Sequence, residues 1–367
     1  MKTARVMVAD SERDANMLYA TGLFVPDAFI YFEIAGQRHV VMSDLEIDRA
    51  KKNATVDRVH SLSRYQKQFD VRALEQLLPL TLREHRVRGV EVPMNFPAGF
   101  LKRLTGFRVT VKPDPFIPER ELKSAGEVSK LANALGLAEA GMRAGINCIR
   151  LSRIGRGGFL YWRKVKLTSE HVQGAINATI AGLGGMAPMT IVAGGNQACD
   201  PHEVGHGPLR AHQSIIIDIF PRDMKTGYWG DITRTVVRGR ASDKVRALYV
   251  TVAQGQDIAF AKLRAGVNGR DVHAAVCDLF KRRGFATGRK NGRMQGFFHG
   301  TGHGLGLEIH ESPRVGAVDT TLRAGHVVTV EPGLYYPGIG GVRLEDVAVI
   351  TKTGARNLTT FPKFLEV

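Results

Sequence analysis

A glycine- and histidine-rich stretch between Phe297 and Pro313 constrains the fold of this chain more than any other segment. It reads FFHGTGHGLGLEIHESP and places three histidines, His299, His303 and His310, within twelve residues. Glycine lacks a Cβ atom, so the repeated glycines let the backbone pass close to a ligand. The LGLEI segment alternates as a short strand does. This predicts that His303 lies where a glycine-rich turn leads into that strand, with His310 at its far end.

Four carboxylates in apolar segments support a metal site, since neutral imidazole is the commonest side-chain ligand of transition metals. They are Asp218 in SIIIDIF, Asp231 in GYWGDITRT, Glu331 in VVTVEPG and Glu345 in GVRLEDVAV. A buried carboxylate needs a partner or a metal. The aspartates flank the turn FPRDMKTGYWG and the glutamates flank PGLYYPGIGG. Two hairpins would therefore bring each pair together.

Four carboxylates together with His303 suit two divalent ions better than one. Two ions a few ångströms apart repel each other, and shared carboxylates can both neutralise and bridge them. Oxygen ligands with a single nitrogen favour Mn, Co, Fe or Zn over Cu. A salt bridge to one of the many arginines would explain any one of the carboxylates, but not the whole set.

The length of 367 residues predicts two domains. Residues 1–115 alternate strand and helix patterns, which favours an α/β domain with a mixed sheet. In it, YATGL and DAFIYFEIAG are expected in a buried strand, and Ser43 and Asp44 could cap the helix LEIDRAKKN. Three prolines in the nine residues of KPDPFIPER mark the boundary. A second domain, residues 121–367, follows.

The charge is strongly positive, with 51 basic and 35 acidic residues and a net charge of +16. Such an excess can indicate a nucleic-acid partner. The basic clusters are short, however, and none interleaves with aromatic residues as a single-strand groove would; they lie at residues 163–166, 281–283 and 289–293. We therefore expect a solvated basic surface, and not a nucleic-acid-binding protein.

Other features predict a cytoplasmic protein without a membrane segment. No apolar run reaches the length of a membrane span, and the first residues lack the pattern of a secretory signal. Three scattered cysteines argue against a disulfide framework and fit a reducing compartment; they are Cys148, Cys199 and Cys277.

From Glu121 to Val367 the chain resembles the pita-bread metallopeptidases, which include methionine aminopeptidase, aminopeptidase P, prolidase and the metal-free relative creatinase. The motifs GYWGDITRT, HGTGHGLGLEIHE, VEPGLY and the Arg-x-Glu of GVRLEDVAV stand in the order of that family. The resemblance implies an α+β pita-bread catalytic domain over 121–367, preceded by a creatinase-type α/β domain over 1–115.

By that resemblance, Asp231 and Glu345 would bridge two metal ions. Asp218 would complete the coordination of one ion, and His303 and Glu331 that of the other. A hydroxide between the ions would attack the scissile carbonyl, and Glu331 would accept its proton. The first aspartate stands in Asp-Ile-Phe, where the family has Asp-x-Gly, and 13 positions separate it from the second, so the hairpin shape is expected to differ.

The resemblance also implies residues that act on the substrate. His310 would stabilise the tetrahedral intermediate, and His299 would contact the substrate. His202 in CDPHEVGH would be the second substrate-side histidine; His206 competes for this role, but the proline before His202 fits the family better. Arg343 would orient the bridging glutamate or the metal-bound waters, or it would be a plain surface arginine.

The N-terminal half resembles the domain of the proline-selective members, which implies release of the first residue from Xaa-Pro peptides. A homodimer and two divalent ions are implied as well, with Mn²⁺ expected first. The alternative is an Xaa-Pro dipeptidase, or prolidase. A non-catalytic pita-bread binding protein and metal-free creatinase-type hydrolysis are disfavoured, because all five ligand positions are filled.

Overall fold

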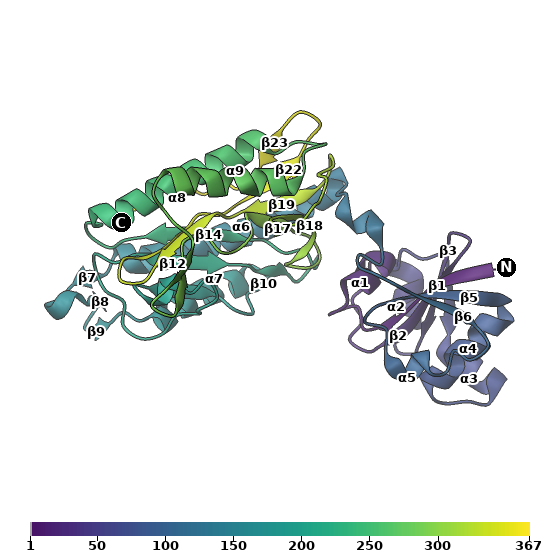
Figure 1. Ribbon diagram of the computed structural model, residues 1–367. Helices are drawn as coiled ribbons and strands as arrows, with labels where there is room; N and C mark the ends of the chain where they lie inside the picture. The colour runs from purple at the N-terminus through teal and green to yellow at the C-terminus, as the bar shows by residue number, and fades with distance from the viewer. Residues whose placement is uncertain (1) are drawn as a thin grey trace. The chain divides into compact units, whose positions relative to one another are not determined.

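The computed structural model describes residues 2–367 and forms two compact units, one up to Arg120 and one from Glu121 to Val367 (Figure 1). The first unit is a six-stranded mixed sheet in the order β4-β3-β2-β1-β5-β6. The pairs β1–β5, β5–β6 and β3–β4 are parallel and the others antiparallel. Its elements are β1 (Lys2–Ala9), α1 (Ala15–Thr21), β2 (Phe29–Ile34), β3 (Gln37–Met42), α2 (Ile47–Asn53), β4 (Arg58–Ser61), α3 (Leu62–Phe69), α4 (Leu74–Glu84), β5 (Val87–Pro93), α5 (Ala98–Leu101) and β6 (Arg108–Lys112).

Two local predictions in this unit were wrong. The YAT of YATGL ends helix α1, because Asp14 caps the helix by accepting from the Met17 N–H and Gly22 ends it with a left-handed backbone. Helix α2 exists as predicted, but the residue at its N-cap is Glu46, whose side chain makes no capping hydrogen bond. The central strand β1 was not foreseen.

The proline-rich stretch packs with the first unit up to Arg120. Phe116 and Ile117 are buried in a core shared with α1, β2 and β3. The Arg120 guanidinium donates to the Asn16 side chain at 2.8 Å. The unit therefore extends past residue 115, because apolar side chains beyond that point still find a core in it.

The second unit contains two helix pairs, each packed on an antiparallel sheet. Helices α6 and α7 pack together and cover the sheet β11-β12-β14, while α8 and α9 cover the sheet β18-β17-β19-β22-β23 (Figure 1). Its elements are α6 (Ala125–Arg150), β7 (Arg153–Ile154), β8 (Leu160–Trp162), β9 (Val165–Lys166), α7 (Ser169–Gly182), β10 (Gly185–Met186), β11 (Ile191–Gly194), β12 (Ile215–Ile219), β13 (Arg222–Asp223), β14 (Ile232–Val236), α8 (Asp243–Lys262), α9 (Gly269–Arg282), β15 (Gly288–Lys290), β16 (Arg293–Gln295), β17 (Gly302–Gly304), β18 (Glu311–Val315), β19 (Val327–Val330), β20 (Gly333–Tyr336), β21 (Gly340–Arg343), β22 (Asp346–Ile350) and β23 (Ala355–Asn357), with 3₁₀ turns at Arg156–Gly158 and Gln197–Cys199. A further 3₁₀ turn, Pro118–Glu121, spans the boundary between the units.

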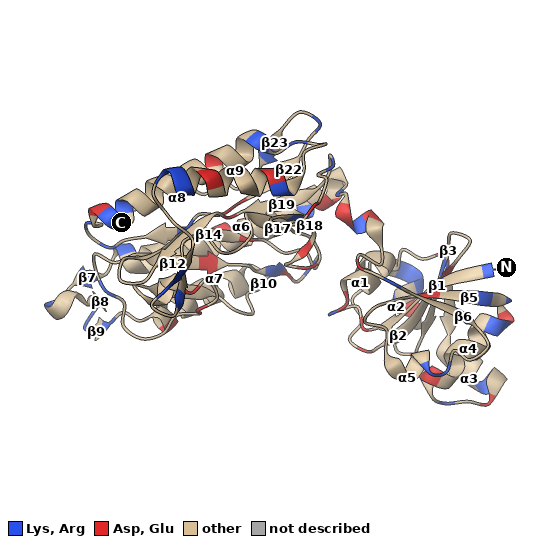
Figure 2. Cartoon of the chain, viewed as in Figure 1, with Lys and Arg blue, Asp and Glu red and all other residues tan. Residues whose placement is uncertain are grey.

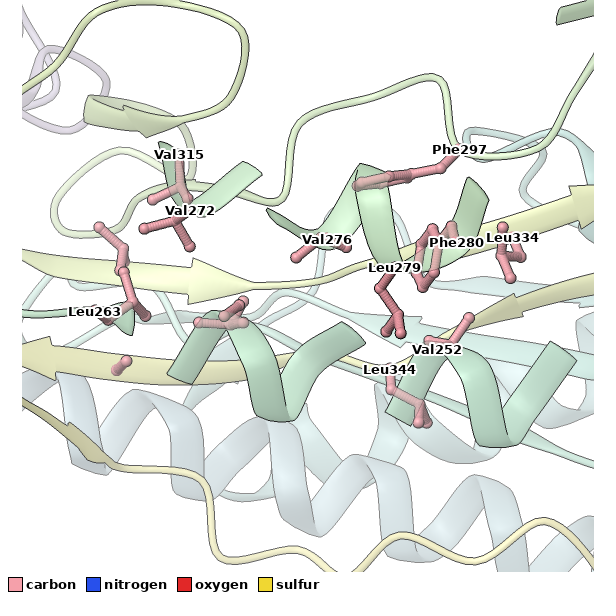
Figure 3. Close-up of a cluster of buried hydrophobic side chains, with 14 of the residues drawn as sticks. Val252, Leu263, Val272, Val276, Leu279, Phe280, Phe297, Val315, Leu334 and Leu344 are labelled. Atoms are coloured by element: carbon pink, nitrogen blue, oxygen red, sulfur yellow. The ribbon is translucent and has the colours of Figure 1, made fainter. Parts of the chain in front are cut away.

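The core under α8 and α9 fixes the start of the glycine- and histidine-rich stretch. Phe280 of α9 and Val252 of α8 face Leu334 and Leu344 across this core (Figure 3). The Phe297 ring packs edge-on against Phe280, with 5.3 Å between the ring centroids. Burial of Phe297 therefore anchors the stretch immediately before its first histidine.

Polar contacts join the two halves of this unit where their hairpins meet. The Glu345 N–H donates to the Thr233 carbonyl at 3.0 Å. Thr235 Oγ1 donates to the Arg343 carbonyl at 2.9 Å and accepts from the Arg343 N–H at 3.0 Å. These buried bonds hold the end of one hairpin against the end of the other.

The strand predicted for LGLEI is wrong. The strand is β17, which contains His303 itself, and the residues from Leu305 to His310 form an irregular loop. The flanking glycines explain why the strand lies there: a Cβ at Gly302 would fall 1.9 Å from the Thr329 carbonyl oxygen, and one at Gly304 would fall 2.2 Å from that of Ser312. Only glycine permits this approach to the neighbouring strands.

Lys and Arg positions are distributed over helices and loops of both units (Figure 2). This fits the expectation of a basic solvated surface. Among the described residues, no helix combines the length and apolarity needed to cross a membrane.

The buried histidine His326, just before β19, is expected to make the stability of the second unit sensitive to acid. The imidazole is 2% exposed, and its Nδ1 accepts from the Arg323 N–H at 3.1 Å. Burial, together with the charges of Arg323 and Lys123, lowers the pKa of His326 to about 4. Protonation would also require Nδ1 to give up its hydrogen bond.

We therefore expect acid to destabilise the unit through His326. The pKa of His326 in the folded protein lies below its unfolded value of about 6.5. The contribution of neutral His326 to the free energy of unfolding is therefore complete above pH 6.5 and is lost as the pH falls towards 4. At pH 4.5 the loss is about 2 kcal/mol. Thermal unfolding should show a smaller fall in Tm between pH 7 and 4.5 for His326→Gln than for the wild type. The exposed His206→Gln should behave as the wild type; equal slopes for all three would contradict this.

Candidate metal centre

The two predicted hairpins are present and converge at their ends. Strand β12, which carries Asp218, pairs antiparallel with β14, and Asp231 immediately precedes β14. Strand β19 pairs with β22 in a register that opposes Val330 and Asp346. The residues next to this pair, Glu331 and Glu345, therefore face each other across the same end of the sheet.

Three predicted ligands form a compact buried group. Asp231, His303 and Glu345 each offer one ligand atom, and these atoms lie within 4.8 Å of one another. The side chains are almost fully buried. His303 Nε2 lies 3.8 Å from Asp231 Oδ2 and 3.4 Å from Glu331 Oε1, so a fourth ligand faces the same point.

The hydrogen bonds of His303 aim one ring nitrogen at the carboxylates. Its Nδ1–H donates to the Gly304 carbonyl at 3.1 Å, and its backbone N–H donates to Thr329 Oγ1 at 3.1 Å. Burial, followed by the charge of His310, lowers the pKa of His303 to about 3. The imidazole is therefore neutral, with the lone pair of Nε2 free for a metal.

The carboxylates repel one another strongly. Burial and then the charge of Glu345 raise the pKa of Asp231 well above its usual value. Burial and then Glu331 do the same to the pKa of Glu345. Burial raises the pKa of Glu331 to about 7, and Arg343 opposes the shift. A single guanidinium cannot neutralise this group of acids, so the site lacks positive charge.

The donor set fits divalent cations on two counts. Two dications would supply the missing charge to four carboxylates. In addition, Asp218 Oδ1 is buried and has no hydrogen-bond partner among residues 2–367. An orphaned carboxylate oxygen beside a free imidazole nitrogen is the arrangement that a metal ion completes.

Arg343 is buried, so it is not a plain surface arginine, and the candidate ligand that it contacts directly is Asp218. Its Nη2 donates to Asp218 Oδ2 at 2.6 Å, and its Nε donates to Thr233 Oγ1 at 3.4 Å. Thr233 Oγ1 in turn donates to Glu345 Oε2 at 2.8 Å. Arg343 thus contacts one ligand directly and reaches Glu345 through a threonine that the sequence analysis did not single out.

Tyr335 is a second residue that the sequence analysis missed. Arg343 Nη1 donates to the Tyr335 hydroxyl at 2.9 Å, and that hydroxyl lies 2.9 Å from His299 Nε2. Because His299 Nδ1–H donates to the Gly300 carbonyl at 2.8 Å, Nε2 is the acceptor of the tyrosine proton. Both nitrogens of His299 are engaged within the protein, and its contact with a substrate stays a prediction.

His310 and His202 lie at the exposed side of the site. The His310 ring stands perpendicular to that of His303, with 4.3 Å between their centroids. The carbonyl of Pro201, the residue before His202, accepts from Arg343 Nη2 at 3.4 Å, so the segment that carries His202 borders the site. His206 instead lies 3.5 Å from Glu203, with an exposed side chain. The geometry favours His202 over His206 as the histidine of this site.

A buried arginine supports the site from the far side of β14. Arg234 donates to the Glu345 carbonyl at 2.6 Å and to Asp346 Oδ1 at 2.8 Å. It therefore fixes the backbone that carries one metal ligand. The sequence Ile232-Thr233-Arg234 could have indicated these roles, because successive residues of a strand point to opposite faces and Thr233 and Arg234 therefore support the site from different sides.

A buried group of four carboxylates and one imidazole, at the joined ends of two hairpins, is a donor set that suits the divalent ions of a metal-dependent hydrolase. Comparison with known protein families identifies the class more closely. Residues 129–352, more than half of the chain, match metallopeptidase family M24. The chain belongs to metallopeptidase family M24 and is a divalent-metal peptidase.

Related proteins cover nearly the whole chain. It is 30% identical over 356 residues to a protein of Pyrococcus horikoshii named Xaa-Pro dipeptidase, covering 95% of this chain and 91% of the relative. Its fold resembles an Xaa-Pro dipeptidase from Bacillus anthracis, with a TM-score of 0.83, 24% identity and coverage of 99% and 95%. It also resembles an X-Pro aminopeptidase from Thermotoga maritima, with a TM-score of 0.82, 22% identity and coverage of 100% and 97%. The predicted fold class, a mixed-sheet α/β unit before a pita-bread unit, is confirmed.

Proposed function

We propose that this protein is a dinuclear metallopeptidase that hydrolyses the bond between a first residue and a following proline. The observation that carries the proposal is the convergence of Asp231, His303, Glu331 and Glu345, with Asp218 held beside them by Arg343. Asp231 and Glu345 would bind both ions. Asp218 would complete the coordination of one ion, and His303 with Glu331 that of the other.

Two bound divalent ions would activate a water molecule and polarise the scissile carbonyl. Glu331 would accept a proton from that water; its Oε1 lies 3.4 Å from His303 Nε2, at the edge of the group of candidate ligands. His310, on the exposed side, would donate a hydrogen bond to the charge that develops on the carbonyl oxygen. His202 and His299 would flank the proline of the substrate.

A proline-specific substrate is supported by the relative from Pyrococcus horikoshii, which is named Xaa-Pro dipeptidase and aligns with 95% of this chain. On this ground we place Xaa-Pro dipeptides first. The family resemblance of the sequence implies release of the first residue from longer Xaa-Pro peptides. That activity is the second candidate, favoured by the exposure of His202 and His310, which leaves one side of the site open to a longer chain.

Mn²⁺ is the first metal to test, with Co²⁺, Zn²⁺ and Fe²⁺ as alternatives, because a set of oxygen ligands with one imidazole suits all four. A cytoplasmic homodimer is proposed with this function. The net charge of +16 would suit a non-catalytic binding protein, but the complete set of candidate metal ligands favours the enzyme.

Activity is expected to depend on metal and on proline. Protein stripped with a chelator should hydrolyse nothing, and Mn²⁺ should restore activity. Mass spectrometry would follow three substrates: an Xaa-Pro dipeptide, an Xaa-Pro tripeptide and a Met-Ala peptide. Proline removes the N–H of the scissile amide and fixes φ, so it requires a dedicated pocket.

We expect cleavage of the dipeptide. Cleavage of the tripeptide as well would show that the site is open beyond the proline, and no cleavage would show that it is closed there. Cleavage of the tripeptide alone would make the protein an Xaa-Pro aminopeptidase. Cleavage of the Met-Ala peptide alone would refute the proline specificity. Full activity of the stripped protein would refute the metal requirement.

A further inference from the structure

Three histidines of the first unit form a cluster that contains no residue of the candidate catalytic centre. His39 lies on β3, His60 on the adjacent strand β4, and His85 at the end of α4. One ring nitrogen of each lies within 4.8 Å of those of the other two. No other histidine occurs among residues 2–120. The folded sheet thus collects every imidazole of this unit at one place.

The nitrogens of the cluster lie close to the separations that a shared metal ion requires. His39 Nδ1 and His60 Nε2 are 3.0 Å apart. Two nitrogens bound to one tetrahedral Zn²⁺ lie roughly 3.3 Å apart, given Zn–N bonds of about 2.0–2.1 Å. The His85 nitrogen lies no more than 4.8 Å from the nitrogens of His39 and His60. A movement of the His85 side chain by about 1.5 Å would therefore bring all three nitrogens within reach of one ion.

Tyr65 holds the outer nitrogen of His60 and also lies beside a nitrogen of His85. Its hydroxyl lies 3.2 Å from His60 Nδ1 and 3.5 Å from His85 Nε2. Metal-bound histidines are usually oriented in this way, by a hydrogen bond from the nitrogen that does not bind the metal. With Nδ1 of His60 bound to Tyr65, its Nε2 is left to face His39.

The surroundings favour neutral ligands and tolerate a cation. The Phe32 ring stacks on His39 at 4.6 Å and shields it from water. Burial, followed by neighbouring imidazoles, lowers the pKa values of His39 and His60 to about 4, so both rings are neutral at pH 7. Asp57 raises the pKa of His39 and Glu84 raises that of His60, as negative charges near a cation would, while Arg58 acts on both rings in the opposite sense.

We propose that His39, His60 and His85 form a second metal site, which binds one divalent transition-metal ion of the Zn²⁺ class through three imidazoles. A three-histidine set with an open fourth position suits Zn²⁺, Cu²⁺ or Ni²⁺ better than Mn²⁺, because nitrogen ligands favour the former ions. The site differs from the catalytic centre in its chemistry, since the latter offers one imidazole and four carboxylates. It ties β3, β4 and the end of α4 together.

The test measures Zn²⁺ bound to the full-length, tag-free chain after chelator treatment and equilibrium dialysis. Asp231→Asn/Glu345→Gln serves as the background, because it weakens the catalytic centre. Adding His60→Gln to this background should remove one equivalent of Zn²⁺ per chain. Adding His206→Gln, an exposed histidine outside the cluster, should remove none. Tyr65→Phe should keep the ligands but raise the Kd for Zn²⁺ by about 10- to 100-fold.

Equal Zn²⁺ content with and without His60→Gln would overturn the proposal and leave the cluster as a hydrogen-bonded stack. If His60→Gln does not fold, electron paramagnetic resonance of Cu²⁺ in the background variant gives an independent answer. Coupling of the copper to three nitrogens is expected. Coupling to one nitrogen or none would place the metal elsewhere and refute the site.

Discussion

Replacing Asp231 with asparagine, or Glu345 with glutamine, is expected to abolish peptidase activity and reduce the bound metal. Each substitution is nearly isosteric but removes a charge and a ligand oxygen from a residue proposed to bind both ions. Several kcal/mol of transition-state stabilisation depend on those ions, so kcat should fall by roughly 10³-fold or more. Kinetics with Mn²⁺ and metal analysis of the same samples provide the measurement.

The stability of the stripped variants distinguishes loss of metal from misfolding. Burial and mutual repulsion raise the pKa of Asp231 and Glu345 in the metal-free site. A raised folded pKa means that these groups destabilise the fold as the pH rises above their unfolded values. Stripped Asp231→Asn should therefore have a higher Tm at pH 7 than the stripped wild type.

The exposed Asp319→Asn, which loses a surface ion pair with Arg270 and alters a surface hydrogen bond from the Asn268 side chain, serves as the control and should keep both metal and activity. Wild-type kcat in Asp231→Asn or Glu345→Gln would refute the bridging role. A lower Tm for the stripped variants would mean that loss of activity reports damage to the fold.

Replacing His310 with alanine is expected to separate catalysis from metal binding. His310 stands perpendicular to His303 on the exposed side of the site and is not in the ligand group. Its removal should leave both metals bound but lower kcat by about 10²- to 10³-fold, as expected when one hydrogen-bond donor to a developing negative charge is lost. KM should change much less than kcat.

His303→Ala is the matched comparison, because it should lose metal as well as activity. Metal content measured beside kcat discriminates the two histidines. If both variants lose metal equally, the assigned roles are wrong. If His310→Ala retains full kcat, another group must stabilise the transition state.

The sequence by itself determined which residues would meet at the metal centre. Asp218 and Asp231 flank one turn, and Glu331 and Glu345 flank another, so local hairpin pairing predicts each pair without knowledge of the rest of the chain. The structure has both hairpins in the expected strands. Their approach to His303 was predicted because buried carboxylates cannot remain unpaired.

The local structure around His303 was less predictable. LGLEI alternates as a strand would, yet it is a loop. Contacts with neighbouring strands, of Gly302 with Thr329 and of Gly304 with Ser312, select the strand at His303 instead. Periodicity describes one segment, whereas the space left for a Cβ depends on the neighbouring strands.

Only the tertiary structure decided the hydrogen-bond partners and the second histidine cluster. Arg343 could have oriented Glu345 or pointed to solvent; packing of the two hairpins directs it to Asp218 and Tyr335. His39, His60 and His85 are separated by more than 20 positions each and show no metal-binding motif. Their nitrogens meet because β3 and β4 are adjacent strands and α4 ends beside them, and long-range pairing of this kind leaves no local trace in a sequence.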